Sequence, residues 1–495
     1  MKKQFKVLAF IMLICLLVPM VVSCSGNAED STTLPDTVTT PAVDGVDTSR
    51  TTDHIPTDTY NGATFTVLVG ANVTGVPHIF EPQNLEDSVD AAINERNLKI
   101  EKQYDIEINE VYQFKHTYGA SSGSAYDKIL VAVESQEPLY NMAVGATYDC
   151  ATMAKLGWLA DLRDYGCIDL NKAWWDQAAN RQLTINGRTF FTAGDISYLD
   201  DHYTYAMIFN KDYAEQLNIN DIYQLVENKE WTYDKFYQYC KDATNTANSV
   251  GYSEDAKYGF LGYKDTIYMS FASVGSTVAH VNDAGELELS LKSEKNFKVI
   301  KDWTEFGQDS SFINWQTFSL SWSDVYRKNQ SLFFGATMAG IYAIRNTEAK
   351  YGIIPFPMFD TEQDVYHSGM SPNHISLFCI PNIGNDKHIA MTAALVEAFG
   401  AGSDKVVEAF YTKNLEGKIV QDNESVETLK LVFADKIFDL GYYFSIGNYR
   451  STIAQMFVNG DATFSSSYDK TELDAKLTVA QINKAFKDLD FSITQ

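Results

Sequence analysis

Several residues could act as nucleophiles, bases or metal ligands, but their spacing matches no complete catalytic site. Gly119-Ala120-Ser121-Ser122-Gly123 fits the G-x-S-x-G pattern, in which a serine nucleophile occupies a sharp turn between a strand and a helix. Here the pattern lies within a Gly/Ser-rich stretch, residues 115–125. No H-E-x-x-H motif occurs, the eight histidines are dispersed and no C-x-x-C pair exists. The spacing therefore predicts neither a serine hydrolase nor a metal centre, and it indicates no cofactor.

The cysteine at position 24 has the surroundings of a residue that becomes lipidated. Three lysines within the first six residues precede an apolar stretch, residues 7–22, which meets Val21-Val22-Ser23-Cys24. Small residues before a cysteine, directly after such a stretch, are typical of a bacterial lipoprotein signal. We predict that residues 1–23 are removed and that the Cys24 thiol receives a diacylglycerol. An uncleaved anchor and an ordinary secretory signal are the alternatives, and all three place the rest of the chain outside the cytoplasm.

Residues 25–59 differ in composition from the remainder of the chain. They are rich in Ser, Thr, Asp and Pro and contain few large aliphatic side chains. Such a segment buries too little apolar surface to offset the entropy lost on ordering. We therefore expect residues 24–59 to comprise the acylated cysteine and a disordered tether, which holds the folded part away from a membrane surface.

The folded part, about 435 residues, is too long for one ordinary core and predicts two lobes. The formal net charge is −26, and loss of the three signal lysines makes the mature chain more acidic still. A protein this acidic is not expected to bind nucleic acid or anionic lipid head groups. We expect a monomer that contacts the membrane through its lipid anchor only. Four cysteines remain in the folded part, and we expect buried free thiols, although three disulfide pairings stay open.

Apolar runs alternate with amphipathic patterns along the folded part, which predicts an α/β fold with mainly parallel, covered sheets. Thr64 to Gly70 is a strand pattern that ends at glycine, and Tyr140 to Gly145 is another. The expected helices are 87–104, 126–133, one that follows the strand at 140–145 and ends at 156, 211–217, 294–306, 388–399 and 475–489, and further strands are expected at 106–108 and 205–209.

Five short stretches carry a family resemblance, and they occur in the family's order. They are Gly157-Trp158-Leu159-Ala160-Asp161-Leu162, Asn186 to Phe191 followed by Ile208 to Asp212, Trp231 to Phe236, Gly335-Ala336-Thr337-Met338, and Tyr351 to Pro357. In this order they resemble the family 1 extracellular solute-binding proteins, the group that includes maltose-binding protein. The chain departs from the family pattern at Thr192-Ala193, where proline is expected, and at Tyr233, where tryptophan is usual.

The resemblance implies a two-lobed periplasmic-binding-protein-like fold with a hinge and a central ligand cleft. Lobe 1 would comprise residues 60–203 plus about 366–430, and lobe 2 about 204–365 plus 431–495. It also implies a non-enzymatic function: capture of a carbohydrate, a mono- or oligosaccharide, and delivery to the permease subunits of an ATP-binding-cassette importer. The expected location is the extracytoplasmic face of the cell membrane.

The resemblance also places ligand-binding residues, and a structural alternative stands beside each. Tyr148 and Asp149 follow the strand at 140–145 in the loop 146–149, unless Asp149 caps a helix. Asp201 and Tyr203 lie at the first crossover between lobes, near 201–205. The remaining candidates, each with core packing or a solvated turn as its alternative, are Trp175, Tyr342, Arg345, Asn373 and Tyr442.

Two other function classes remain open at this point. The protein could serve a sensor or a surface glycan system instead of an importer. It could also be an anchored hydrolase, because any two of its 65 acidic residues could meet as a catalytic carboxylate pair.

Overall fold

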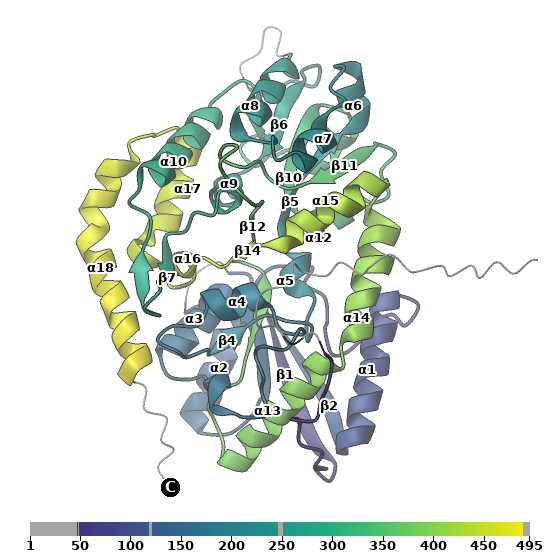
Figure 1. Ribbon diagram of the computed structural model, residues 1–495, viewed down its shortest axis with the longest axis vertical. Coiled ribbons are helices and arrows are strands. Elements are labelled where there is room, and N and C mark those ends of the chain that lie inside the picture. Colours follow the sequence, from purple (N-terminus) through teal and green to yellow (C-terminus); the bar gives the residue numbers. More distant parts are fainter. Residues whose placement is uncertain (1–46, 48, 118–120, 246–250, 489–495) are drawn as a thin grey trace, which may run out of the picture. The chain divides into compact units, whose positions relative to one another are not determined.

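The computed structural model describes residue 47 and residues 49–117, 121–245 and 251–488. Two five-stranded sheets organise this part of the chain (Figure 1). The first sheet has the order β2-β1-β3-β13-β4, with β1 (Ala63–Ala71), β2 (Ile106–Phe114), β3 (Met142–Ala146), β4 (Phe191–Thr192) and β13 (Ile375–Cys379). Strand β1 is parallel to β2 and β3, whereas β13 is antiparallel to β3 and β4.

The second sheet has the order β11-β5-β10-β6-β9 (Figure 1). Its strands are β5 (Tyr205–Asn210), β6 (Tyr258–Gly262), β9 (Phe312–Asn314), β10 (Ser331–Thr337) and β11 (Tyr351–Ile354). Strand β6 is parallel to both β10 and β9, so these three strands end at one edge of the sheet. Strand β5 is antiparallel to β10 and β11.

Helices pack around each sheet, and we call each sheet with its helices a lobe. The first lobe contains α1 (Ser88–Tyr104), α2 (Ser124–Ser135), α3 (Thr147–Lys155), the 3-10 turn Leu162–Asp164, α4 (Gln177–Gln182) and α13 (Asp386–Ala401). The second lobe contains α6 (Lys211–Gln216), α7 (Ile222–Glu227), α8 (Tyr233–Asp242), α9 (Thr266–Ser273), β7 (Ala279–Val281), β8 (Leu287–Leu289), α10 (Glu294–Phe306), α11 (Trp322–Arg327), α12 (Met338–Ala343), α15 (Asn423–Ala434), α17 (Tyr449–Asn459) and α18 (Phe464–Asp488). Short polar side chains cap several of them: Asp87 accepts a hydrogen bond from Val89 N at 2.9 Å at the start of α1.

The chain passes between the lobes through α5 (Leu199–His202), through β12 (Ser368–Gly369), and through α14 (Asp404–Glu408) with the π-helix Ala409–Ile419. Three further short elements connect α15 to α17 of the second lobe: β14 (Lys436–Ile437), α16 (Leu440–Tyr443) and the 3-10 turn Ile446–Asn448. Strands β12 and β14 pair in parallel. Thr204 pairs with Met370, and Ser371 N donates to Tyr203 O at 3.1 Å. Backbone hydrogen bonds thus connect residues 203–204, at the first crossing, to residues 370–371, and connect β12, at the second crossing, to β14.

Most of the expected strands and helices are confirmed, among them β1, β3, β5, α1 and α10. Both sheets are mainly parallel, as expected, and each contains one reversed strand, β13 in the first sheet and β5 in the second. Strands β5 and β13 enter their sheets directly after the chain crosses between lobes, so neither follows a neighbouring strand through a single covering helix.

Two local expectations also differ from the structure. Residues 147–149, expected in a loop, form the first turn of α3. Helix α18 begins at Phe464 instead of near 475. Packing accounts for the early start, because Tyr468 stacks on Tyr449 at 5.1 Å and this contact outweighs the weak helix propensity of the three preceding serines.

The expected division of the chain into lobe 1 and lobe 2 stays a prediction, except at residue 430, where lobe 1 was expected to end. That boundary falls inside α15, and α15 packs on β11 and α7 of the second lobe.

The last part of the expected tether is docked on the first lobe. Lys172 Nζ donates to Asp47 Oδ2 at 2.5 Å, and Arg50 pairs with Asp195. His54 Nε2 lies 2.9 Å from Glu397 Oε1, and Ile55 is buried. We call the described residues between 47 and 59 the strap. The expectation of disorder is therefore wrong for the strap, because its residues find ion-pair and apolar partners on the lobe.

Some of the predictions concern residues outside the described part of the chain. The signal peptide, Cys24, residues 25–46 and part of the G-x-S-x-G stretch lie there. Among the described residues, no helix has the length and apolarity needed to span a bilayer. Cys150, Cys240 and Cys379 are buried free thiols there, as expected, whereas Cys167 is a free thiol that is only half-buried.

Candidate functional site

Polar side chains gather at the carboxyl ends of β1 and β3 in the first lobe. Asn72 follows β1, and Tyr148 and Asp149 follow β3. Asn72 Nδ2 donates to Tyr148 Oη at 3.0 Å and to Asp149 Oδ2 at 2.9 Å. Asn72 Oδ1 accepts from Ser124 N at 2.7 Å and from Ser124 Oγ at 2.9 Å. Ligands of open α/β sheets bind at this edge of the strands. We call Asn72, Ser124, Tyr148 and Asp149 the first-lobe polar group.

Asp149 is the charged member of this group and is fully buried. Burial raises the pKa of Asp149 to about 7, against the lowering effect of the hydrogen bond from Asn72. Within the described residues, Asp149 Oδ1 has no hydrogen-bond partner. Glycine at position 123 makes room for this carboxyl, because a Cβ there would lie 1.7 Å from Asp149 Oδ2. The group therefore offers a buried acceptor without a protein donor.

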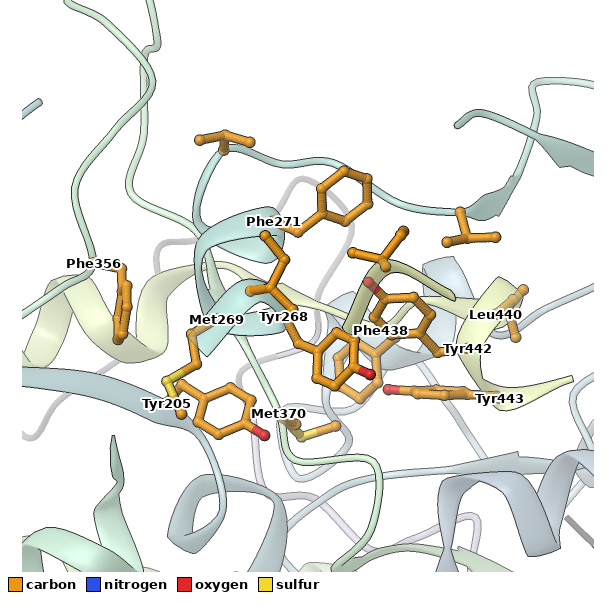
Figure 2. Close-up of a cluster of buried hydrophobic side chains, with 14 of the residues drawn as sticks. Tyr205, Tyr268, Met269, Phe271, Phe356, Met370, Phe438, Leu440, Tyr442 and Tyr443 are labelled. Carbon is orange, nitrogen blue, oxygen red and sulfur yellow. The ribbon is translucent and has the colours of Figure 1, made fainter. Parts of the chain in front are cut away.

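A second polar group lies in the second lobe. Asp265 follows β6, Tyr268 is on α9, Tyr442 is on α16 and Arg450 is on α17. The Arg450 guanidinium lies over the Tyr268 ring, 5.0 Å from its centroid, and Tyr268 Oη donates to Arg450 O at 2.9 Å. The Tyr268 and Tyr442 rings meet edge to face at 5.1 Å. Figure 2 shows these two tyrosines gathered with other buried side chains from β5, α9 and α16. We call Asp265, Tyr268, Tyr442 and Arg450 the second-lobe polar group.

Three polar atoms of this group are buried without a hydrogen-bond partner among the described residues: Asp265 Oδ1, Arg450 Nε and Tyr442 Oη. Burial raises the pKa of Asp265, while Arg450 opposes that rise. Each unpaired buried group costs roughly 1–3 kcal/mol, and such groups concentrate where a ligand or function explains them. Within the described residues, the group thus combines an unpaired acceptor, an unpaired cationic donor and an unpaired hydroxyl with the two rings of Tyr268 and Tyr442.

A charge cluster lies where the chain crosses between the lobes. Lys436 Nζ contacts Asp176 Oδ2 at 2.6 Å, Asp200 Oδ2 at 2.6 Å and Asp201 Oδ1 at 2.8 Å. Burial alone would lower the pKa of Lys436, but the three carboxylates hold it well above its ordinary value. Burial raises the pKa of Asp200 despite the ammonium group. Tyr411 Oη donates to Asp201 Oδ2 at 2.6 Å. We call Asp176, Asp200, Asp201 and Lys436 the hinge charge cluster.

Tyr203, another predicted site residue, lies beside this cluster at the first crossover. Its ring is buried and stacks on His374, with centroids 4.1 Å apart. Burial, assisted by repulsion from His202, lowers the pKa of His374 to about 4. Asp201 and Tyr203 are therefore both engaged by protein partners from the other crossing segments.

The structure brings some predicted residues together and separates others. Asn373 Oδ1 accepts from Arg450 Nη2 at 3.0 Å, which joins Asn373 to the second-lobe polar group with Tyr442. Arg345 lies over the ring of Tyr342, 3.8 Å from its centroid, at the end of α12. Trp175 is buried in the first lobe, where its indole N–H donates to Glu397 Oε2 at 3.0 Å and its ring contacts Phe378 at 5.2 Å. That environment corresponds to core packing.

Five residues of the two polar groups were not identified from the sequence: Asn72, Ser124, Asp265, Tyr268 and Arg450. Asp265 and Tyr268 carried a usable signal, because they follow an apolar strand pattern that ends at Gly262. Arg450 carried none, since it lies within an ordinary amphipathic helix and its partners are distant in sequence.

The space between Tyr268, Met370, Asp439 and Tyr442 is small in this conformation. The cavity there has a volume of about 20 Å³, room for about one water molecule. A larger ligand would enter only after the surrounding segments move apart. Opening about the crossing segments would provide that movement.

Comparison with known proteins identifies the family. Residues 83–379 match the model of the bacterial extracellular solute-binding proteins. The chain belongs to this family. A comparison with curated proteins found no match.

Solved structures show that this family member has the two-lobed periplasmic-binding-protein-like fold. The substrate-binding protein Lmo0181 from Listeria monocytogenes, in complex with cycloalternan, is 15% identical with a TM-score of 0.52, over 86% of this chain and 99% of that one. UspC from M. tuberculosis is 12% identical with a TM-score of 0.53, over 84% and 100%. The galacto-N-biose-/lacto-N-biose I-binding protein from Bifidobacterium longum is 13% identical with a TM-score of 0.52, over 85% and 98%.

Proposed function

We propose that this solute-binding protein captures a carbohydrate outside the cytoplasm, while anchored to the membrane through Cys24, and delivers it to the permease of an ATP-binding-cassette importer. One observation carries the proposal. The second-lobe polar group presents a carboxylate oxygen, a guanidinium Nε and a phenol hydroxyl that lack hydrogen-bond partners within the described chain, beside the rings of Tyr268 and Tyr442.

A sugar supplies what this group lacks. Its C–H face packs on aromatic rings, and each hydroxyl can donate to a carboxylate while accepting from a guanidinium. The first-lobe polar group offers the same chemistry at Asp149. The solved relatives from Listeria and Bifidobacterium contain bound sugars, which supports the ligand class proposed here.

Ligand-dependent stabilisation tests the proposal. The protein is screened against mono- and oligosaccharides, polyols and peptides, and we expect only the sugars to raise its melting temperature. A ligand present at 100 times its Kd stabilises the folded state by about 2.7 kcal/mol. The sugar should be recovered uncut. Release of shorter sugars would instead support a hydrolase, and stabilisation by peptides alone would contradict the carbohydrate assignment.

Matched variants connect binding to the site. Asp265→Asn and Arg450→Gln should each weaken sugar binding by tenfold or more, because each leaves its partner groups incompletely paired. Asp302→Asn is the control, since Asp302 lies on α10 in a partly exposed pair with Lys298. Equal affinities in all three variants would place the ligand elsewhere.

The anchor is tested separately. We expect radiolabelled palmitate to enter the full-length protein and to be lost in Cys24→Ala, with the variant released from the membrane fraction. Unchanged labelling would contradict lipidation at Cys24 without affecting the assignment of the ligand.

A further inference from the structure

Two aromatic residues beside the second-lobe polar group have no role in the function proposed so far. Tyr263 directly follows β6, and Trp315 directly follows β9. The two strands are parallel, with Gly262 opposite Asn314, and Trp315 N donates to Gly262 O at 3.1 Å. The two rings therefore emerge side by side from one edge of the sheet, with centroids 5.3 Å apart. This is the edge at which open α/β sheets bind ligands.

Tyr263 and Trp315 each pack against a cluster of buried apolar side chains without being enclosed by it. Both side chains are only partly buried, so an apolar surface faces outward at the strand ends. The indole Nε1 of Trp315 is nevertheless buried and has no acceptor among the described residues. A buried donor without a partner is unfavourable, and a ligand oxygen would relieve it.

The pair is also continuous with the second-lobe polar group. Asp265 is two residues beyond Tyr263. Desolvation raises the pKa of the Tyr263 hydroxyl well above its ordinary value, and the neighbouring Tyr205 and Asp265 add to the rise. A ligand bound at Asp265 and Arg450 would therefore reach Trp315 by passing over Tyr263.

We propose that Tyr263 and Trp315 form a stacking platform for a second sugar ring, so that the ligand is an oligosaccharide and not a monosaccharide. One sugar unit would occupy the second-lobe polar group. The next unit would lie with its C–H face on the aromatic pair, and one of its oxygens would accept from the Trp315 N–H. The inference rests on the proposed carbohydrate function and specifies the size of the ligand.

The test measures affinity against chain length. The probes are gluco-oligosaccharides with α-1,4 or β-1,4 links and β-1,4 xylo-oligosaccharides, each from one to four units, titrated calorimetrically. For the wild-type chain we expect affinity to rise from one unit to two or three. Trp315→Ala should abolish that rise, with a loss of about tenfold for the trisaccharide and less than twofold for the monosaccharide. Trp315→Phe should retain part of the gain, because it keeps a ring but loses the N–H.

Trp322→Phe is the matched control. Trp322 is a partly buried tryptophan of the same lobe, stacked on Phe334 at 4.8 Å, on helix α11. It should leave every affinity unchanged. Equal losses for mono- and trisaccharide in Trp315→Ala, no loss at all, or tightest wild-type binding to a monosaccharide would each overturn the platform. Failure of the wild-type chain to bind any probe would overturn the carbohydrate function itself. This outcome is seen in the wild-type chain alone, so it is distinguishable from a failure of the platform, which is seen in the variants or in the dependence on chain length.

Discussion

Replacement of Lys436 by methionine tests the hinge charge cluster most directly. The side chain is almost completely buried, and its ammonium group is the partner of three carboxylates, Asp176, Asp200 and Asp201. Methionine keeps most of the volume and removes the charge. The variant would leave three buried acidic groups next to one another without a cation between them, so the folded state must retain protons on them or separate them.

The expected cost follows from the burial of the cluster. Removal of one partner from a buried ion pair typically costs about 3–5 kcal/mol, because a charge remains buried without compensation. An unfolding entropy of about 2.1 cal/mol/K per residue converts this cost to a fall of about 3–5 °C in the melting temperature of a chain of this size. Lys430→Met is the control, since Lys430 pairs with Glu427 at the surface and such pairs contribute about 0–1 kcal/mol.

The assay is urea unfolding of both variants at pH 8 and pH 5. Without the ammonium group, burial keeps the folded-state pKa of Asp200 well above its unfolded value of about 3.9. Stability from the protonated carboxyl is present at low pH and is lost as the pH rises through the raised pKa. The deficit of Lys436→Met should therefore be larger at pH 8 than at pH 5. A deficit within 1 kcal/mol of the control, or one that grows as the pH falls, would refute the reasoning.

Three further predictions concern the strap, the first-lobe polar group and the crossover histidine. Deletion of residues 25–46 should leave the melting temperature unchanged, whereas deletion of 25–59 should lower it by several degrees in the same thermal scan, because the strap partners on the first lobe lose their contacts. Gly123→Ala should weaken ligand binding in calorimetry by tenfold or more, since the added Cβ would displace Asp149. Between pH 6.5 and pH 4.5 the His374 ring of the unfolded chain binds a proton, whereas the folded ring, with its pKa near 4, does not. The wild-type chain should therefore lose stability to urea as the pH falls through this interval. His374→Gln lacks the titrating ring, so its loss should be smaller by about 1–3 kcal/mol.

These predictions have controls and contradicting outcomes of their own. Gly166→Ala should bind ligand normally, because a Cβ at that position meets no atom within 4 Å; equal loss in both glycine variants would indicate a general backbone effect. The strap would be dispensable if both deletions melted together. A pH profile of His374→Gln parallel to that of the wild-type chain would show that another group controls acid stability.

The sequence predicted elements well where one local pattern determines them. The run from Thr64 to Gly70 consists of apolar and β-branched residues and ends at glycine, a pattern typical of a strand, and β1 is that strand. Helix α18 was harder, because its first turn depends on the stacking of Tyr468 against Tyr449 and not on local propensity. The direction of β5 and β13 was harder still to predict. Each of these strands enters its sheet after the chain has crossed from the other lobe, and no local pattern reports that crossing.

The site was only partly predictable, for a related reason. The adjacent acids Asp200 and Asp201 were recognisable as unusual, but the cation that pairs with them is Lys436, more than 230 residues later. Nothing local distinguishes an acid that a distant lysine engages from one that faces a ligand. The same holds for Arg450, whose partner Asn373 is 77 residues away in sequence.

The docked strap restricts how an anchored protein could move. If Cys24 holds the lipid, only residues 25–46 separate the bilayer from the first lobe, and even a fully extended chain of that length spans no more than about 75 Å. The strap is attached to the first lobe alone. The anchor would therefore restrain the first lobe, and the second lobe would move relative to it about the hinge. The position of the strap would thus determine which lobe stays close to the membrane, where the permease lies.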